Sequence, residues 1–587
     1  MHTFLSFRLR RVGQVAARAG LGLAMALAMT VCARGLAAQE SSPDRSGLDR
    51  MGEERGRILL VLPFDNRTGQ PSLEWIREAS AEILSRRLAS AGFASMSRAD
   101  RLYALDHLGL PQGFHPSRAT ALKLAETLDA DSIVVGSYLT DGTGIVAEAR
   151  LVDVPRLRMS EAVTARGEMR DLISVFNSLA WKLTRQLDPG FKGSEETFVA
   201  AGAGLSLVAF EQYIRGITEP DQAERLRRLN QAVAMSPDFG PAWMALGQED
   251  YSGQQYEQAA AAFGKVVRGD PKALGPDALE AGFYRGLSLV FSGDYAKAEE
   301  AFAGVARVLP LAEVVNNEAV AVSRQGHDGS ALFRQAVETD PNAADYHFNL
   351  AVSLKRHGGY DAEALTELAQ CLRLRPGDSE ALAVQKAWTE SAQPRPAKPE
   401  PAKAPVPPQV AKAGEPDDTH NLEGDAGAKP DPLERIARNF DAVAFHQAAL
   451  MLDQVDESRL AALTPLKRAE MLAGLAKDYL DRGLLLEAER LYQSAVAADP
   501  KVAEAHAGLA EVRERTGDAE AARKEARTSL ELMPSVGAYL VMGRLDLAAG
   551  HMDQASYDAG EALKLAPTNR AAQELWRQIE AREGQKK

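Results

Sequence analysis

Cysteine is scarce in this sequence of 587 residues, which contains only two. Two cysteines exclude a disulfide framework and a zinc site built from thiolates. Aromatic residues are also few, at 6% of the chain. An excess of positive charge is absent as well, because 68 lysine and arginine residues stand against 81 aspartate and glutamate residues. The resulting charge of −13 argues against a nucleic-acid binder that relies on bulk positive charge.

The sequence also lacks the motifs of several enzyme classes. It contains no His-Glu-x-x-His zinc-peptidase motif, no Gly-x-Ser-x-Gly elbow, no Walker phosphate loop and no kinase motif set. His107 and His115 have no cysteine or carboxylate at ligand spacing, and the histidines of the helical region fall at packing positions or in turns, so the sequence predicts neither a metal site nor a bound cofactor. An enzyme is therefore the least favoured class of function.

The first 38 residues have the order of a secretory signal peptide. Arginines precede the apolar run Ala19–Ala33, and small residues then lead to the polar Gln39. The run is shorter than the about 20 residues that a membrane-spanning helix needs. We therefore expect cleavage after residue 38, a disordered stretch over 39–56, and a periplasmic or envelope-associated protein without an integral membrane segment. An uncleaved anchor is the alternative.

Residues 57–190 show the alternation of a small α/β domain. The apolar run Ile58–Phe64 predicts a strand that is buried on both faces. Asp65 and Asn66 follow it as turn-forming residues. Further strands are expected over 93–97, 132–138, 145–152 and 159–167, and helices over 73–91, 98–108, 117–128 and 172–187.

Two motifs of this region resemble one family. Leu60–Asn66, with Gly69 soon after, resembles the opening of the TolB amino-terminal-like domain, which is related to the flagellar FlgO and curli CsgG domains. Ala130–Tyr138 resembles a later strand of that domain. The resemblance implies a non-catalytic domain of exported proteins that serves in binding or assembly and is often joined to helical repeats.

Prolines recur at intervals near 34 residues in the rest of the chain. They are Pro271, Pro310, Pro341 and Pro376, and then Pro500, Pro534 and Pro567. Before each proline, small and large apolar residues follow a similar order. The pattern predicts two antiparallel helices that cross at the small residues, with the proline ending the second helix. This pattern resembles the tetratricopeptide repeat of about 34 residues.

The predicted fold is therefore a small α/β domain followed by two all-α tetratricopeptide solenoid arrays, over 204–391 and 433–583. Residues 378–391 and 569–583 are expected to form capping helices. Residues 433–465 are expected to form a divergent helical pair at the start of the second array. A disordered linker over 392–432 separates the arrays, because this stretch is rich in proline, alanine and charge and has almost no large apolar residue.

The repeats suggest where partners bind, because the first helices of such units line a concave face that takes extended segments of other proteins. Asn317 and Asn349 occupy matching positions in consecutive first helices, where their amides can hydrogen-bond to a peptide backbone. Ordinary solvated asparagines are the alternative. Lys355 and Arg356 lie near one end of this face and could pair with an acidic partner. Cys371 falls at a repeated small-residue position and is expected to be a buried core residue.

The sequence thus favours a non-enzymatic scaffold or adaptor that binds other proteins in the cell envelope and serves in assembly or trafficking of envelope complexes. The alternative is a sensory module whose α/β domain binds a small molecule or glycan. The partner and the oligomeric state are left open.

Overall fold

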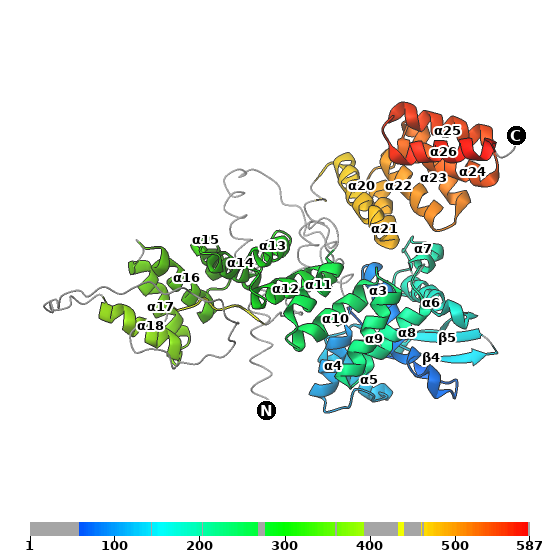
Figure 1. Ribbon diagram of the computed structural model, residues 1–587. Helices are drawn as coiled ribbons and strands as arrows, with labels where there is room; N and C mark the ends of the chain where they lie inside the picture. Colours follow the sequence, from blue (N-terminus) through cyan, green and yellow to red (C-terminus); the bar gives the residue numbers. More distant parts are fainter. Residues whose placement is uncertain are drawn as a thin grey trace, which may run out of the picture. The chain divides into compact units, whose positions relative to one another are not determined.

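The structure is a computed structural model (Figure 1). It describes residues 58–142, 144–201, 204–267, 276–358, 361–391, 432–438, 460 and 463–584. They divide into two compact units. One unit holds the described parts of 58–252 and 460–584, and the other holds those of 253–438. The predicted signal peptide, the stretch 39–56 and all of the predicted linker except its last residue lie outside the described residues.

A mixed sheet of seven strands forms the middle of the α/β domain. The strands are β1 (Ile58–Val61), β2 (Asp65–Asn66), β3 (Ala94–Ser95), β4 (Ser132–Asp141), β5 (Gly144–Asp153), β6 (Arg158–Met159) and β7 (Val163–Glu168). β1 pairs in parallel with β3 and β4, and β2 pairs in parallel with β4. β5 pairs antiparallel with β4, β6 and β7, and β4 and β5 are the long arrows in Figure 1. Strands lie in all the expected places, but the one expected over Ile58–Phe64 ends at Val61, the one expected over 93–97 is only Ala94–Ser95, and the one expected over 159–167 is divided into β6 and β7.

Helices cover the sheet on both faces. They are η1 (Pro71–Leu73), α3 (Ile76–Ser90), α4 (Arg98–His107), α5 (Arg118–Thr127), η2 (Met169–Asp171) and α6 (Leu172–Leu187). α4 and α5 pack on the face that carries Leu60 and Ile133. Because side chains alternate along a strand, Leu59 and Val61 face the opposite layer, where α3 and α6 contact each other. All four of these residues are at most 1% exposed, which confirms the prediction of a strand buried on both faces.

The two motifs that resemble the TolB family meet in space. A Cβ added at Gly136 would lie 2.3 Å from the ring of Phe64, so the absence of a side chain lets this ring lie directly on β4. The ring also packs edge-on against Phe176 of α6, with centroids 5.8 Å apart. Asn66 closes the predicted turn, since its Oδ1 accepts the backbone N–H of Thr68 at 3.0 Å.

Paired helices make up the rest of the described chain. After the domain come α7 (Glu195–Ala200), which the sequence did not predict, α8 (Leu207–Thr218), α9 (Gln222–Met235) and α10 (Gly240–Ser252). The first array continues with α11 (Tyr256–Val266), α12 (Pro276–Phe291), α13 (Tyr295–Ala306), α14 (Ala312–Arg324), α15 (Ser330–Thr339), α16 (Ala344–His357), α17 (Asp361–Leu374) and α18 (Ser379–Ser391). The second array consists of α20 (Pro465–Asp481), α21 (Leu485–Ala498), α22 (Ala503–Arg515), α23 (Ala519–Leu532), α24 (Val536–Ala549), α25 (Met552–Leu565) and α26 (Arg570–Gly584). α18 and α26 are the two expected capping helices.

Small residues allow the two helices of a repeat, and helices of consecutive repeats, to approach closely, as predicted. A Cβ at Gly286 would lie 2.6 Å from the ring of Phe302, and one at Gly508 would lie 2.0 Å from the ring of Tyr492. Cys371 takes such a position on α17 and is fully buried, which confirms its core role. Burial raises the pKa of its thiol to about 11. None of the described helices combines the length and the apolar character needed to cross a bilayer.

A histidine bridge recurs once in each array. Nδ1 of His347 lies 2.5 Å from Glu367 and its Nε2 lies 3.0 Å from the carbonyl oxygen of Pro341. His506 has the same geometry with Glu525, at 2.7 Å, and with the carbonyl of Pro500, at 3.0 Å. Both ring nitrogens face acceptors, so only the protonated imidazole satisfies both.

We expect Gly508→Ala to destabilise the second array by about 1–3 kcal/mol, because the new methyl group collides with Tyr492. Gly474 on α20 is the matched control, since no atom within 4 Å would meet its added Cβ. Gly474→Ala should leave stability unchanged or raise it by about 0.4–1 kcal/mol. Urea unfolding followed by circular dichroism measures both. Equal unfolding midpoints for the two variants would contradict this account of the crossing.

The bridge of His506 should make stability depend on pH. The hydrogen bond to Glu525 raises the pKa of His506 against the effect of burial, and the Pro500 carbonyl adds to the rise. The stabilisation is complete below the unfolded pKa of about 6.5 and is lost as the pH rises through the higher folded pKa. The melting temperature of the wild-type chain should therefore exceed that of His506→Gln most at acidic pH. Glu525→Gln should remove the same pH dependence. If the difference in melting temperature between the wild type and His506→Gln grew as the pH rose, the proposed role of the bridge would be refuted.

Candidate functional site

One side of the first array holds a segment of the chain itself. The first helices α14 and α16 lie side by side in consecutive repeats, and residues 432–438 lie along them. This is the short yellow segment that passes beside α16 in Figure 1. These seven residues, which we call the docked segment, form neither helix nor strand. The prediction that a helical pair begins at 433 is therefore wrong for 433–438, and residues 439–459 lie outside the described residues.

The two predicted asparagines hold the backbone of the docked segment. Asn349 donates from Nδ2 to the carbonyl oxygen of Arg435 at 2.7 Å and accepts the N–H of the same residue at 2.6 Å. Asn317 makes the same pair of bonds with Ala437, both at 2.8 Å. The two gripped residues are two positions apart, which is the repeat of an extended chain. Both asparagines are fully buried, so the alternative of ordinary solvated asparagines is wrong.

A third asparagine, which the sequence analysis missed, connects the first two. Asn316 donates to Oδ1 of Asn317 at 3.2 Å and to the carbonyl oxygen of Arg435 at 3.1 Å. Its own Oδ1 accepts from Asn349 at 2.7 Å. The three amides thus form one network that holds each of them in place. The Asn-Asn dipeptide on a first helix was the available sequence signal.

The side chain of Arg435 enters an acidic pocket between the start of α16 and the turn that leads from α17 into α18. Its guanidinium makes two bonds to Asp378, at 2.6 and 2.8 Å, two to Glu380, at 2.8 and 3.1 Å, and one to Asp345, at 2.8 Å. It also lies 3.8 Å from the ring centroid of Phe348, where cation and ring attract each other. We call these four residues the arginine pocket.

Charge pairing inside the arginine pocket is tight. The hydrogen bonds from Arg435 are the main cause that lowers the pKa of Asp378 to about 2, and the N–H of Ala381 also contributes. Burial alone would lower the pKa of Arg435, but its bonds to the carboxylates raise it. Arg375 is the second cation nearby, at 2.7 Å from Asp345. Without Arg435, three carboxylates would face one arginine.

A basic site receives the residue before Arg435. Glu434 is buried, and its carboxylate pairs with Arg356 and accepts from Ser323 at 2.5 Å. Arg356 also donates to the carbonyl oxygen of Pro432 at 3.0 Å. Arg324 donates to the carbonyl oxygen of Glu434 at 3.1 Å. The structure thus places Arg356 against an acidic residue of the chain itself, and its pairing with an acidic partner stays a prediction.

Lys355 does not join this arrangement. Its amine pairs with Asp361 at 2.7 Å and lies 5.9 Å from the ring centroid of Trp388. Among the described residues, no hydrogen bond or ion pair links Lys355 to the docked segment. Lys355 and Arg356 are neighbours in sequence, so they project from the helix in different directions and only one of them reaches the groove.

The docked segment runs opposite to the order of the repeats. Arg435 is held by α16 and Ala437 by α14, while Arg438 lies over the ring of Phe291 on α12 at 4.9 Å. The second array lacks the asparagines. His506 matches His347 in its bridge, and two residues later Gly508 stands where the first array has Asn349. The backbone grip is therefore a property of the first array.

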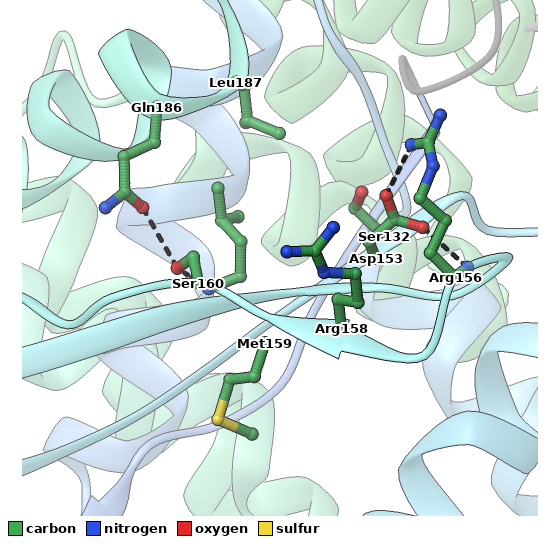
Figure 2. Close-up of a pocket in the computed structure, with 9 residues that line it drawn as sticks. Ser132, Asp153, Arg156, Arg158, Met159, Ser160, Gln186 and Leu187 are labelled. Atoms are coloured by element: carbon green, nitrogen blue, oxygen red, sulfur yellow. Dashed lines mark hydrogen bonds and ion pairs between the residues drawn. The ribbon is translucent and has the colours of Figure 1, made fainter.

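Outside the groove, the described residues offer few candidate sites for a metal ion or a small ligand. No group of three or more His, Cys, Asp or Glu side chains among the described residues is arranged to hold a metal ion. A surface pocket of the α/β domain lies between β5, β6 and the end of α6 (Figure 2). Its polar lining includes Ser132, Asp153, Arg156, Arg158, Ser160 and Gln186.

Comparison with known proteins identifies the helical repeats. The model of the tetratricopeptide repeat family matches residues 244–312, 320–379 and 474–535. No curated protein matches the sequence. The resemblance of residues 57–190 to the TolB amino-terminal-like domain stays a prediction.

Among solved structures, similar chains include YrrB, described as a TPR protein with an unusual peptide-binding site. It is 15% identical, covers 36% of this chain and 99% of its own, and has a TM-score of 0.26. The first TPR of Spaghetti, bound to the HSP90 peptide SRMEEVD, is 22% identical over 20% of this chain and 95% of its own, with a TM-score of 0.19. The LpoB C-terminal domain from Escherichia coli is 22% identical over 22% of this chain and 99% of its own, with a TM-score of 0.18. The family match shows that this chain carries tetratricopeptide repeats in both helical arrays.

Proposed function

We propose that this protein is a non-enzymatic scaffold or adaptor whose first repeat array binds extended segments of other proteins. One observation carries the proposal: Asn317 and Asn349 each grip the N–H and the C=O of a residue in the docked segment. Backbone bonds of this kind do not depend on the side chains of the bound segment. The same grip suits any extended chain that offers free N–H and C=O groups two residues apart.

The chemistry of the groove supports binding rather than catalysis. Its side chains are amides, carboxylates and guanidinium groups that are paired with each other or with the docked segment. The thiol of the neighbouring α17, Cys371, is fully buried with a raised pKa, and a catalytic cysteine needs the opposite. Tetratricopeptide arrays bind protein partners, and this groove has the polar groups for it.

The cell envelope is the proposed site of action. The order of basic, apolar and small residues over 1–38 supports export, and the motifs that resemble the TolB domain support a role in the envelope. In this proposal the groove holds partners together during the assembly or trafficking of envelope complexes.

Removing an asparagine of the grip should weaken partner binding. Asn349→Ala leaves the N–H of the gripped residue without its partner and its C=O with Asn316 as its remaining amide donor, which costs about 1–3 kcal/mol. Cross-linking of cell envelopes, followed by pull-down of the tagged full chain and mass spectrometry, should show partners that are lost or reduced with Asn349→Ala and with Asn317→Ala. Asn342→Ala is the matched control, because Asn342 is exposed in a turn of the same array. Partners retained equally by all variants would exclude the groove as their binding site.

The pocket of the α/β domain supports the second candidate, a sensory module that binds a small molecule or glycan. Arg156 pairs with Asp153 at 2.8 Å, and Ser160 donates to Gln186 at 3.2 Å (Figure 2). Arg158 is exposed at the same pocket. Two arginines and a serine hydroxyl at one pocket suit an anionic group of a small ligand.

Anion binding at this pocket can be tested directly. Inorganic phosphate and citrate should raise the melting temperature of the wild-type chain, and Arg158→Ala should reduce the rise because it removes one cation of the pocket. Arg166→Ala is the control, since Arg166 is an exposed arginine of β7 outside the pocket. No rise with either anion, or an equal rise for all three proteins, would count against this pocket as a sensor.

A further inference from the structure

We infer that the groove of the first array selects partner segments that present an acidic residue followed by an arginine, and that the docked segment is a built-in competitor for the same groove. The inference rests on the proposed function, because it specifies the partner of that site. The docked segment is the only occupant that the described chain shows, and its side chains reveal what the groove accepts.

The first argument is charge. The arginine pocket contributes the carboxylates of Asp345, Asp378 and Glu380, of which Asp378 is buried. Without a cation from the occupant, Arg375 is the one cation among the described residues that pairs with Asp345 and Asp378. The three carboxylates all contact one guanidinium, so without it they would repel one another. The pocket therefore favours a segment that brings a positive group.

The second argument is geometry. Asp378 receives two parallel bonds from Arg435, and the face of Phe348 lies 3.8 Å from its guanidinium. A planar guanidinium can make both contacts at once. A lysine amine is a point charge that cannot make the paired bonds, so it should bind far less well in the same pocket.

The third argument is register. Asn349 grips the backbone of the residue whose side chain fills the arginine pocket, and the residue before it meets Arg356 and Ser323. Basic and acidic sites therefore stand next to each other along the groove, in fixed order. Two residues after the arginine, an N–H must be donated to Asn317, so proline is excluded at that position. The expected partner pattern is an acidic residue, arginine, any residue, then any residue except proline.

The covalent link makes the docked segment a competitor. Forty residues of sequence lie between Ser391, the end of α18, and Pro432. Because it belongs to the same chain as the groove, the docked segment has an effective concentration on the order of millimolar. A partner segment in solution must exceed this concentration, or bind more tightly, to displace residues 432–438.

The experiment uses the full chain and a fluorescent synthetic peptide, DPLERIARNF, which copies residues 431–440. Anisotropy should show weak binding to the wild-type chain. Arg435→Ala in the chain should raise the affinity at least about tenfold, because the competitor loses its main side-chain contact. Leu433→Ala in the chain is the control, since this side chain is 51% exposed, and it should behave as the wild type. Equal affinities of the wild-type and Arg435→Ala chains would overturn the competitor.

Selectivity is tested on the Arg435→Ala chain with changed peptides, which raise no question of folding. Peptides with Arg435→Lys or Arg435→Ala should bind at least about tenfold more weakly, and a peptide with Leu433→Ala should bind unchanged. Equal binding of the arginine, lysine and alanine peptides would overturn the selection of arginine.

Further measurements distinguish a failure of this inference from a failure of the proposed function. Sedimentation velocity should show no change of assembly when peptide is added to the wild-type chain. Dimers that dissociate with peptide would place the occupant in a second copy and overturn an intramolecular competitor. Selective peptide binding together with no envelope partner in the pull-down would refute the proposed function but leave the groove's selectivity in place. If envelope partners were lost with Asn349→Ala but the peptides showed no preference for arginine, the proposed function would stand and the selectivity of the groove would be refuted.

Discussion

The close crossing of helices at small residues is the constraint on which both arrays depend. At Gly286 and Gly508 an added methyl group would lie 2.6 Å or less from an aromatic ring, so the helices could not keep their present separation. Alanine fills many of the other crossing positions, and this explains why so much of the sequence is alanine. The same first-helix position has different uses in the two arrays. In the second array Gly508 admits the ring of Tyr492, whereas in the first array Asn349 stands there and grips the docked segment, so only the first array has this backbone grip.

The groove contacts the docked segment in two ways, through hydrogen bonds to its backbone and through charge pairs with its side chains. Asparagine amides satisfy the backbone of the docked segment and accept almost any extended chain. The charged sites on either side of Asn349 read two consecutive side chains, Glu434 and Arg435. Buried charges are costly unless they are paired, and a groove of this composition is therefore more stable occupied than empty. In the inferred competition, the docked segment pairs these charges as long as no partner segment displaces it.

Local patterns were sufficient to predict most of the fold. The apolar run at Ile58 lies within one strand, and the proline spacing and the small residues recur with each repeat of about 34 residues. Asn317 and Asn349 could be named for the same reason, since repeats place equivalent residues at equivalent positions. The errors that concern the groove lie where contacts are distant in sequence. Residues 433–438 were assigned to a helical pair, and the arginine pocket was not predicted at all.

The sequence by itself determined the repeats, the α/β alternation and the positions of the groove asparagines, because each follows from a periodic or contiguous pattern of side chains. Only the tertiary structure decided what occupies the groove. Arg435 meets Asn349 across 86 residues of chain and Ala437 meets Asn317 across 120, and no local periodicity encodes such contacts. Leu433 and Ile436 stand out in a region poor in apolar residues, but they do not say where the segment binds. The binding place of the docked segment depends on its backbone N–H and C=O groups, which the groove asparagines satisfy, and on charged side chains that come together only when the chain folds.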